Sequence, residues 1–202
     1  MTSIRRTERV LLGAVFAMEA GGSVIFALMG NLQDEFNFSD VGLGLIAAAG
    51  FMASFVMQIL IAPYADRGHA KRLLIIGTTL AVFGNALFAG GSSLVIFILA
   101  RLVSGAASGL FLPPARALMA SLDDDGVSER LGAMGGAALA GFVTGPVIGG
   151  FLVGPLGLRW PFVIFSIAAL ISLFIVSTQH LPTLPYSKDR QRLAFGLLKE
   201  RS

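Results

Sequence analysis

The chain has 202 residues, of which 55% are hydrophobic and only 13% carry a charged side chain. Soluble domains have about 25% charged residues, so this composition excludes an ordinary soluble domain and indicates a protein that lies mostly within lipid. The formal net charge of +3 does not indicate a nucleic-acid partner, because the basic residues fall in short clusters between apolar runs. The absence of cysteine excludes disulfides and thiolate metal sites.

The first apolar run extends from Val10 to about Met29 and follows the basic residues Arg5, Arg6 and Arg9. A helix needs about 20 such residues to cross a bilayer, so this run predicts a first membrane span. A signal peptide or a twin-arginine address is the alternative. The length of the run, the lack of a cleavage site of the A-x-A kind and the further spans that follow all disfavour it.

Glu19 lies about midway along this first run, beside Gly21, Gly22 and Ser23. A carboxylate at that depth costs on the order of 3 kcal/mol to insert, so we expect it to face a water-filled cavity or a polar partner. Such a carboxyl group is a candidate for binding and releasing a proton. The alternative is a structural carboxylate that is hydrogen-bonded to a neighbouring helix.

The segment from Asn31 to Asp40 is short and acidic and predicts an outside loop, with Ser39 or Asp40 capping the next helix. A second span runs from about Val41 to Tyr64. A charged turn then precedes the third span, and its candidate gate residues are Asp66, Arg67, Lys71 and Arg72. The alternative is a basic anchor on the cytoplasmic side with an incidental Asp-Arg pair.

The third span runs from about Leu73 to Ala89, and the fourth begins near Leu94 and contains Arg101. A guanidinium keeps its charge at ordinary pH, so within the membrane it needs a carboxylate, backbone carbonyls or water. The alternative is that the side chain extends to the outer surface. The following loop, 121–130, contains Asp123 in an acidic run that fits a solvated turn better than a calcium loop.

The fifth span, from about Leu131 to Val153, has glycine along one side. In a bilayer such a segment stays helical, because the lipid offers its backbone no other partners, and its bare side lets a neighbouring helix approach closely. General small-residue packing is the alternative interpretation. The residues of this pattern are Gly132, Gly141, Gly145, Pro146, Gly149 and Gly150.

A sixth span runs from about Pro161 to Thr178, after an outside turn that ends near Trp160. We expect residues 1–181 to form a six-helix transmembrane bundle and 182–202 a cytoplasmic tail or the start of a central loop. With both termini in the cytoplasm, Arg159 is the single basic residue outside. The sequence therefore predicts a multi-pass protein of the cell (inner) membrane.

Three segments resemble motifs of the major facilitator superfamily. The spacing from Gly132 to Gly150 resembles the fifth-helix antiporter motif at every fixed position. The turn after the second span resembles the family's loop between helices two and three, although Ala70 stands where that loop has a basic residue. Arg101 with Gly105 resembles the fourth-helix motif, with Ser104 in the place of its glutamine.

This resemblance implies an all-α, integral membrane fold of six transmembrane helices, arranged as two inverted three-helix repeats that form the N-terminal half of a twelve-helix bundle. It also implies secondary transport by alternating access, with proton-coupled efflux of small molecules or drugs. The proton gradient then replaces any cofactor, and no metal is expected. Glu19 becomes the proton-binding residue, and Arg101 modulates its titration.

The resemblance further assigns a conformational gate to Asp66, Arg67, Lys71, Arg72 and Asp123, in which one aspartate of the acidic run 123–125 pairs with Lys71 or Arg72. It makes the glycine side of the fifth span the surface where two halves meet. The expected partners are the lipid bilayer, a small-molecule substrate, and a missing C-terminal half or a second copy of the chain.

Two other classes of function remain as alternatives. The first is a membrane remnant or assembly partner that transports nothing. The second, more remote, is an intramembrane serine protease using Ser108, which would need a histidine within the membrane. His69 and His180 lie at the predicted cytoplasmic edges, so we predict that the chain is not an enzyme.

Overall fold

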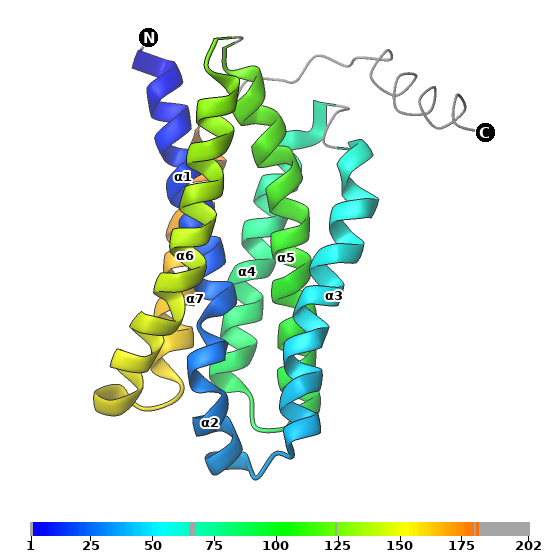
Figure 1. Ribbon diagram of the computed structural model, residues 1–202, viewed down its shortest axis with the longest axis vertical. Coiled ribbons are helices and arrows are strands. Elements are labelled where there is room, and N and C mark those ends of the chain that lie inside the picture. The colour runs from blue at the N-terminus through cyan, green and yellow to red at the C-terminus, as the bar shows by residue number, and fades with distance from the viewer. Residues whose placement is uncertain (1, 65–67, 124, 180, 182–202) are drawn as a thin grey trace, which may run out of the picture.

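The computed structural model describes residues 2–64, 68–123, 125–179 and 181. They form α-helices joined by short connections (Figure 1). The helices are α1 (Thr2–Ser23), α2 (Ile25–Phe36), α3 (Asp40–Tyr64), α4 (Ala70–Gly90), α5 (Leu94–Ser121), α6 (Val127–Leu156) and α7 (Trp160–Thr178).

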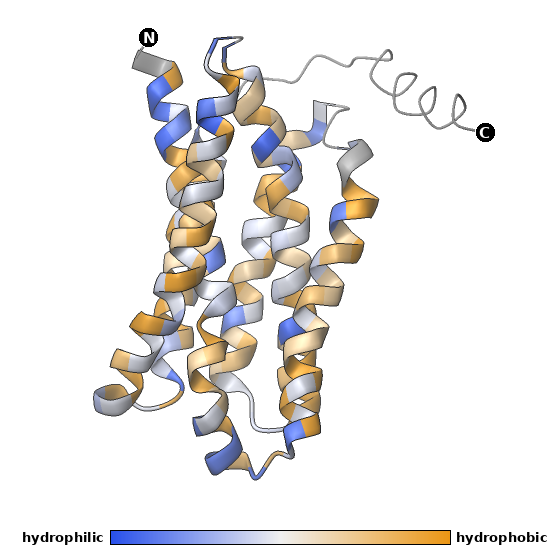
Figure 2. Ribbon diagram, in the orientation of Figure 1, coloured by the Kyte–Doolittle hydropathy of each residue, from blue (hydrophilic) through white to orange (hydrophobic). Residues whose placement is uncertain are grey.

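Six of the segments are long and apolar enough to cross a membrane. The longest, Ile4–Phe36, has 33 residues and comprises α1 and α2, which form one bent span. The shortest is α7 with 19 residues. Figure 2 shows hydrophilic residues gathered at the two ends of the bundle, with mostly apolar helix between them. The predicted all-α fold with six membrane helices is therefore confirmed.

The loop expected to begin at Asn31 is wrong over residues 31–36, which are helical and complete α2. Leu32 is fully buried, and the ring of Phe36 lies 5.3 Å from that of Phe97 in α5. These two apolar side chains, one turn apart, hold the polar segment in helical form against the bundle. Asn37 then ends the helix in the left-handed conformation (φ 53°).

The predicted cap of the second span is confirmed at Ser39. Its hydroxyl oxygen accepts a hydrogen bond of 3.2 Å from the backbone N–H of Gly42. This bond satisfies one of the amide groups that have no partner within the first turn of α3. The connection of three residues, 37–39, therefore turns the chain directly from α2 into the next span.

The helices pack as two related sets of three. In the first repeat, α1 with α2 is followed by α3 and α4, and in the second, α5 is followed by α6 and α7. The first span of each repeat packs on the second span of the other, α1 on α6 and α5 on α3, while α4 packs on α7 (Figure 1). This reciprocal pairing is the arrangement that an inverted repeat produces.

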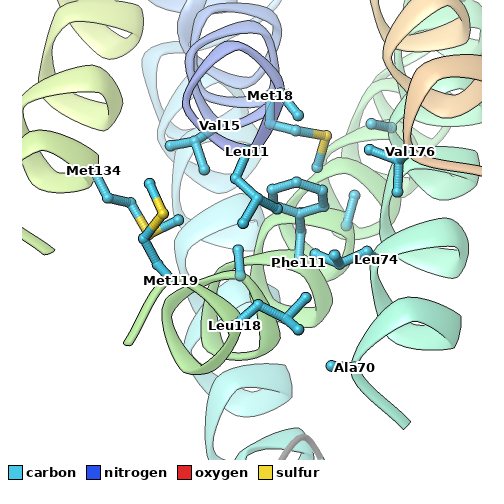
Figure 3. Packing of buried hydrophobic residues seen from close by; sticks show 14 of the residues in the cluster. Leu11, Val15, Met18, Ala70, Leu74, Phe111, Leu118, Met119, Met134 and Val176 are labelled. Carbon is cyan, nitrogen blue, oxygen red and sulfur yellow. The ribbon is translucent and has the colours of Figure 1, made fainter. Parts of the chain in front are cut away.

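One of the two large hydrophobic clusters lies around Phe111 of α5, which is fully buried. Figure 3 shows Leu11 and Val15 of α1 and Leu74 of α4 around this ring. By contrast, α3 and α6 turn many large apolar side chains outward, such as Phe151, which is 78% exposed. These outward surfaces suit lipid or another membrane helix rather than water.

The cluster around Phe111 leads to a stability prediction. We expect Phe111→Ala to lower the free energy of unfolding by about 3 kcal/mol, because it leaves a cavity between three helices. Unfolding by sodium dodecyl sulfate in mixed micelles, followed by circular dichroism, measures the loss. Phe151→Ala is the control, and an equal loss in both variants would contradict the central position of Phe111.

Candidate functional site

The candidate site lies at the bend of the first span, where α1 meets α2. The backbone still forms one bond across this bend, from the N–H of Val24 to the carbonyl oxygen of Ala20, at 3.1 Å. Ser23 donates its hydroxyl to the same carbonyl oxygen at 3.2 Å. Helices commonly bend at pairs of glycine and serine, and here Gly21, Gly22 and Ser23 supply them.

Arg101 reaches this bend from α5. Its Nη1 donates a hydrogen bond of 2.6 Å to the carbonyl oxygen of Gly22, and its guanidinium carbon lies 5.3 Å from the centre of the Phe26 ring. Only 5% of the side chain is exposed, so the alternative of an arginine extending to the outer surface is wrong. In the described part of the chain Arg101 has no carboxylate partner, and its buried Nε donates no hydrogen bond.

Glycine makes room for this guanidinium. A Cβ atom added to Gly50 of α3 would lie 2.6 Å from the guanidinium carbon of Arg101. One turn further along α5, a Cβ on Gly105 would collide with the carbonyl oxygen of Gly50. The two helices therefore touch through their backbones beside Arg101. Two of the sequence features, the arginine and the small residue four positions later, thus belong to one contact.

Glu19 lies one turn before Gly22 on α1 and is half-buried. The Ser108 hydroxyl of α5 interacts with its carboxyl group by hydrogen bonding, and Arg116 acts on it through its charge. The Oε1 atom is buried without a hydrogen-bond partner among the described residues. Glu19 of α1 and Arg101 of α5 therefore both lie where these two helices meet, but they do not form an ion pair with each other.

Asn85 of α4 is a further polar residue at the bend, and the sequence analysis assigned it no role. It is 3% exposed, and its Nδ2 donates to the carbonyl oxygen of Ala81 at 3.0 Å. A Cβ added to Gly21 would lie 3.1 Å from this Nδ2 atom, while the Oδ1 atom is buried without a partner in the described chain. The signal that could have found it is an amide side chain within an apolar run.

The gate residues that the structure describes, Lys71, Arg72 and Asp123, do not form one cluster. Asp66 and Arg67 lie outside the described residues. Lys71 donates from Nζ to the carbonyl oxygen of Gln179 at 2.8 Å, which caps the end of α7, and Arg72 is exposed. A basic group at a helix C-terminus interacts favourably with the unpaired carbonyls there. Lys71 therefore links α4 to α7 rather than to an acidic loop.

The pairing expected between one aspartate of this loop and Lys71 or Arg72 is not made by Asp123 or Asp125, and Asp124 lies outside the described residues. The Asp123 carboxylate accepts a hydrogen bond from the N–H of Asp125 at 3.3 Å within its own turn. Arg130 of α6 fixes this turn, because its guanidinium donates to three backbone carbonyls, those of Met119, Asp123 and Asp125. The turn is thus held against α5 and α6, and Lys71 is engaged elsewhere.

Three glycines of the fifth-span pattern pack against the first span of the same bundle. A Cβ on Gly141 or Gly145 would collide with the carbonyl oxygen of Phe16 or Ala20, respectively, and one on Gly149 would lie 2.6 Å from Cγ2 of Val24. These glycines recur every fourth residue on the buried side of α6. They form a groove into which α1 fits at its bend, which is the close packing that small residues allow.

The expectation that this whole pattern is the surface between two halves is therefore wrong for these three glycines. Their neighbour is a helix of the same half. Gly132 and Gly150 are exposed and have open space beside them, and Pro146 is half-buried. Only this outer part of the pattern is free to contact another bundle.

Comparison with known proteins identifies the family. Residues 11–200 match the Major Facilitator Superfamily. The chain belongs to this superfamily of secondary transporters. It is therefore a multi-pass membrane protein of a transporter family, not a protease or other enzyme. Of the two histidines considered for a protease, His69 lies exposed just before α4 and His180 lies outside the described residues.

Individual relatives agree with this assignment. The chain is 28% identical over 174 residues to multidrug resistance protein 2 of Bacillus subtilis, covering 83% of this chain and 43% of that protein. It is 26% identical over 138 residues to the quinolone resistance protein NorA of Staphylococcus aureus, covering 68% of this chain and 36% of NorA. The chain thus spans less than half the length of these curated relatives.

The fold matches a solved transporter of the superfamily, FucP, which was crystallised in an outward conformation. The TM-score is 0.74 at 18% sequence identity, and the match covers 90% of this chain and 51% of the FucP chain. At this identity the likeness concerns the fold alone. It shows that the six-helix bundle corresponds to about half of a complete transporter of this superfamily.

The contact between α6 and α1 leads to a second prediction. Gly145→Leu must push the two helices apart at the Ala20 carbonyl, so we expect it to lower the free energy of unfolding by about 3 kcal/mol. Gly150→Leu, five residues further along α6 on the exposed side, should change it by less than about 0.5 kcal/mol. The same detergent titration measures both variants. Equal effects would mean that the glycine groove does not determine how α6 packs.

Proposed function

We propose that this chain forms one half of a proton-coupled exporter of small amphipathic compounds, in which Glu19 binds the transported proton. The observation that carries this proposal is a carboxyl group about one turn before the bend of a membrane span, with one buried oxygen that has no hydrogen-bond partner among the described residues. A carboxyl group within a transporter's span is by default a candidate for such a role. The names of the multidrug and quinolone resistance relatives support the class of substrate.

The proposed coupling depends on alternate occupancy of one carboxylate. In its ionised form, Glu19 attracts a cationic substrate to the space beside α1 and α5. When it is protonated the attraction is lost, so the substrate leaves as the proton enters. Because a ligand can shift a two-state equilibrium only through its different affinity for the two states, proton and substrate must each favour one orientation of the bundle.

Arg101 supports this step by holding the bend. Its hydrogen bond to the Gly22 carbonyl fixes the backbone one turn beyond Glu19, and its positive charge lies on the same helix pair. Protonation of the Glu19 carboxyl group can therefore change the angle at which α2 continues from α1. In this proposal Arg101 positions the bend and modulates how Glu19 responds to protons.

A second six-helix bundle completes the proposed transporter. In this fold the substrate site lies between two such bundles, which rock around it. The exposed apolar surfaces of α3 and α6 provide the contact area, including Phe55, which is 65% exposed, and Phe151. A membrane partner that transports nothing is the other candidate function, and it predicts no role for the ionisation of Glu19.

The coupling proposal predicts that Glu19→Gln abolishes proton-coupled efflux. In proteoliposomes with an imposed pH gradient, ethidium movement should fall to the level of empty liposomes, because the amide binds no transported proton. In lightly buffered detergent solution, ethidium should release protons from the wild-type chain but not from the variant. Glu35→Gln, in the exposed end of the same span, is the matched control.

The result of these assays separates the two functions. Proton release that persists in Glu19→Gln would contradict the role of this carboxyl group. If proton release requires Glu19 but efflux appears only when a second six-helix bundle is supplied, the chain carries the coupling site and its partner completes the path. Unchanged efflux in Glu19→Gln would overturn the proposal.

The proposed orientation places both termini in the cytoplasm, because the basic residues of α1, α4 and α6 gather at one end of the bundle. The chain has no cysteine, so single cysteines can report this orientation. We expect Ser93→Cys to react with a membrane-impermeant maleimide in intact cells, and Ser128→Cys to react only after the membrane is opened. The reverse pattern would show the opposite orientation.

A further inference from the structure

A groove of about 320 Å³ lies between α1 and α7, away from Glu19 and Arg101. It is lined by Arg9, Val10, Gly13 and Ala14 of α1 and by Ser172 and Ile175 of α7. Gly13 is exposed, and a Cβ atom added there would meet nothing within 4 Å. The groove is therefore an open, mostly apolar channel at the side of the first span.

The charged end of this groove is basic. Arg9 is exposed and, within the described chain, has no ion-pair partner. Arg6 is also exposed and lies three residues earlier, so both guanidinium groups project on the same side of α1, about one turn apart. Figure 2 shows hydrophilic residues in these first turns of α1, followed by mostly apolar helix.

The acidic residue closest in sequence does not neutralise this pair. Glu8 precedes Arg9 directly, so helix geometry places it about 100° around α1 from Arg9. It is half-buried and has no ion-pair partner in the described chain. The groove thus combines an apolar channel within the bilayer with two uncompensated positive charges where the span leaves it.

We propose that this groove binds an anionic phospholipid. One acyl chain lies along Gly13 and Ala14 against Ile175, where apolar side chains and the missing Cβ leave space. The phosphate lies between the guanidinium groups of Arg9 and Arg6, which suit phosphate because each presents several N–H donors in a plane. Basic pockets between spans at the membrane surface are suited to anionic head groups.

This occupant fits both parts of the groove. A free phosphate would use the arginines but leave the apolar channel empty. A zwitterionic lipid would fill the channel, but its choline or ethanolamine group would bring a third positive charge to the two arginines. An anionic head group offsets part of their charge without adding a cation, and attraction of this kind acts over about one Debye length, or about 10 Å.

The test uses the full chain in nanodiscs of phosphatidylcholine that contain a trace of phosphatidylglycerol with a photoreactive diazirine near the middle of one acyl chain. After irradiation, mass spectrometry of peptides locates the cross-links. We expect them in the peptides that contain residues 10–14 and 172–175. Unlabelled phosphatidylglycerol should compete, whereas additional phosphatidylcholine and soluble glycerol phosphate should not.

Variants separate the charge from the channel. Arg9→Gln should lower cross-linking about fivefold, because one basic residue near the membrane surface contributes attraction of about that size. Gly13→Leu should also lower it, by filling the channel while leaving both arginines in place. Arg159→Gln, at the other end of the bundle, is the matched control and should change nothing. Size-exclusion profiles confirm that each variant is folded.

Each other outcome overturns the proposal. Equal labelling by a photoreactive phosphatidylcholine would show unselective contact with bulk lipid. Competition by glycerol phosphate as strong as that by phosphatidylglycerol would show an anion site without a lipid channel. Labelling that is unchanged in both Arg9→Gln and Gly13→Leu would place the lipid elsewhere. None of these results depends on whether the chain transports protons.

Discussion

The contact between the Arg101 guanidinium and the Gly22 carbonyl is the interaction on which the geometry of this bundle depends. A charge that is 5% exposed within a membrane protein needs partners that lipid does not provide. Here a backbone carbonyl at the bend and the face of Phe26 supply them. The cationic group and the bend therefore stabilise each other. Neither α1 nor α5 can shift at this depth without separating a buried charge from its acceptor.

Close backbone contacts with neighbouring helices place α1 and α5 so that the bond between Arg101 and Gly22 can form. Gly50 and Gly105 bring α3 against α5 beside the guanidinium, and Gly141 and Gly145 bring α6 against α1 beside the bend. In each pair, a helix of one repeat meets a helix of the other. The same kind of small-residue contact is thus used on both sides of the site. As a result, α3 and α6 flank the bundle, and their remaining sides are free for lipid or a second bundle.

Much of this fold could be predicted because a bilayer imposes a length and a composition on each span. The apolar runs gave all six spans, but hydropathy marks only the part of a helix that lies in lipid. The helical residues 31–36 were missed for that reason, since polar side chains there extend beyond the apolar run while Leu32 still packs inward. Glu19 and Arg101 were found because a charge within an apolar run is conspicuous.

Their partners could not be predicted in the same way. The acceptor for Arg101 is a main-chain oxygen, which every residue carries, so no sequence pattern distinguishes Gly22. Glycine spacing indicates that a helix approaches α6 closely, but α1 and a helix of another bundle are equally suitable neighbours. Asp123 lies in a turn that Arg130 holds through main-chain carbonyls, and these acceptors also leave no mark in the sequence.

The way in which Arg130 holds the connection between α5 and α6 has a consequence of its own. All three of its acceptors are main-chain oxygens. These hydrogen bonds therefore depend on the path of the backbone and not on which side chains the turn carries. Acidification that neutralises the neighbouring aspartates removes none of these bonds. Arg130 therefore holds the connection between α5 and α6 in the same way whether these aspartates are charged or neutral.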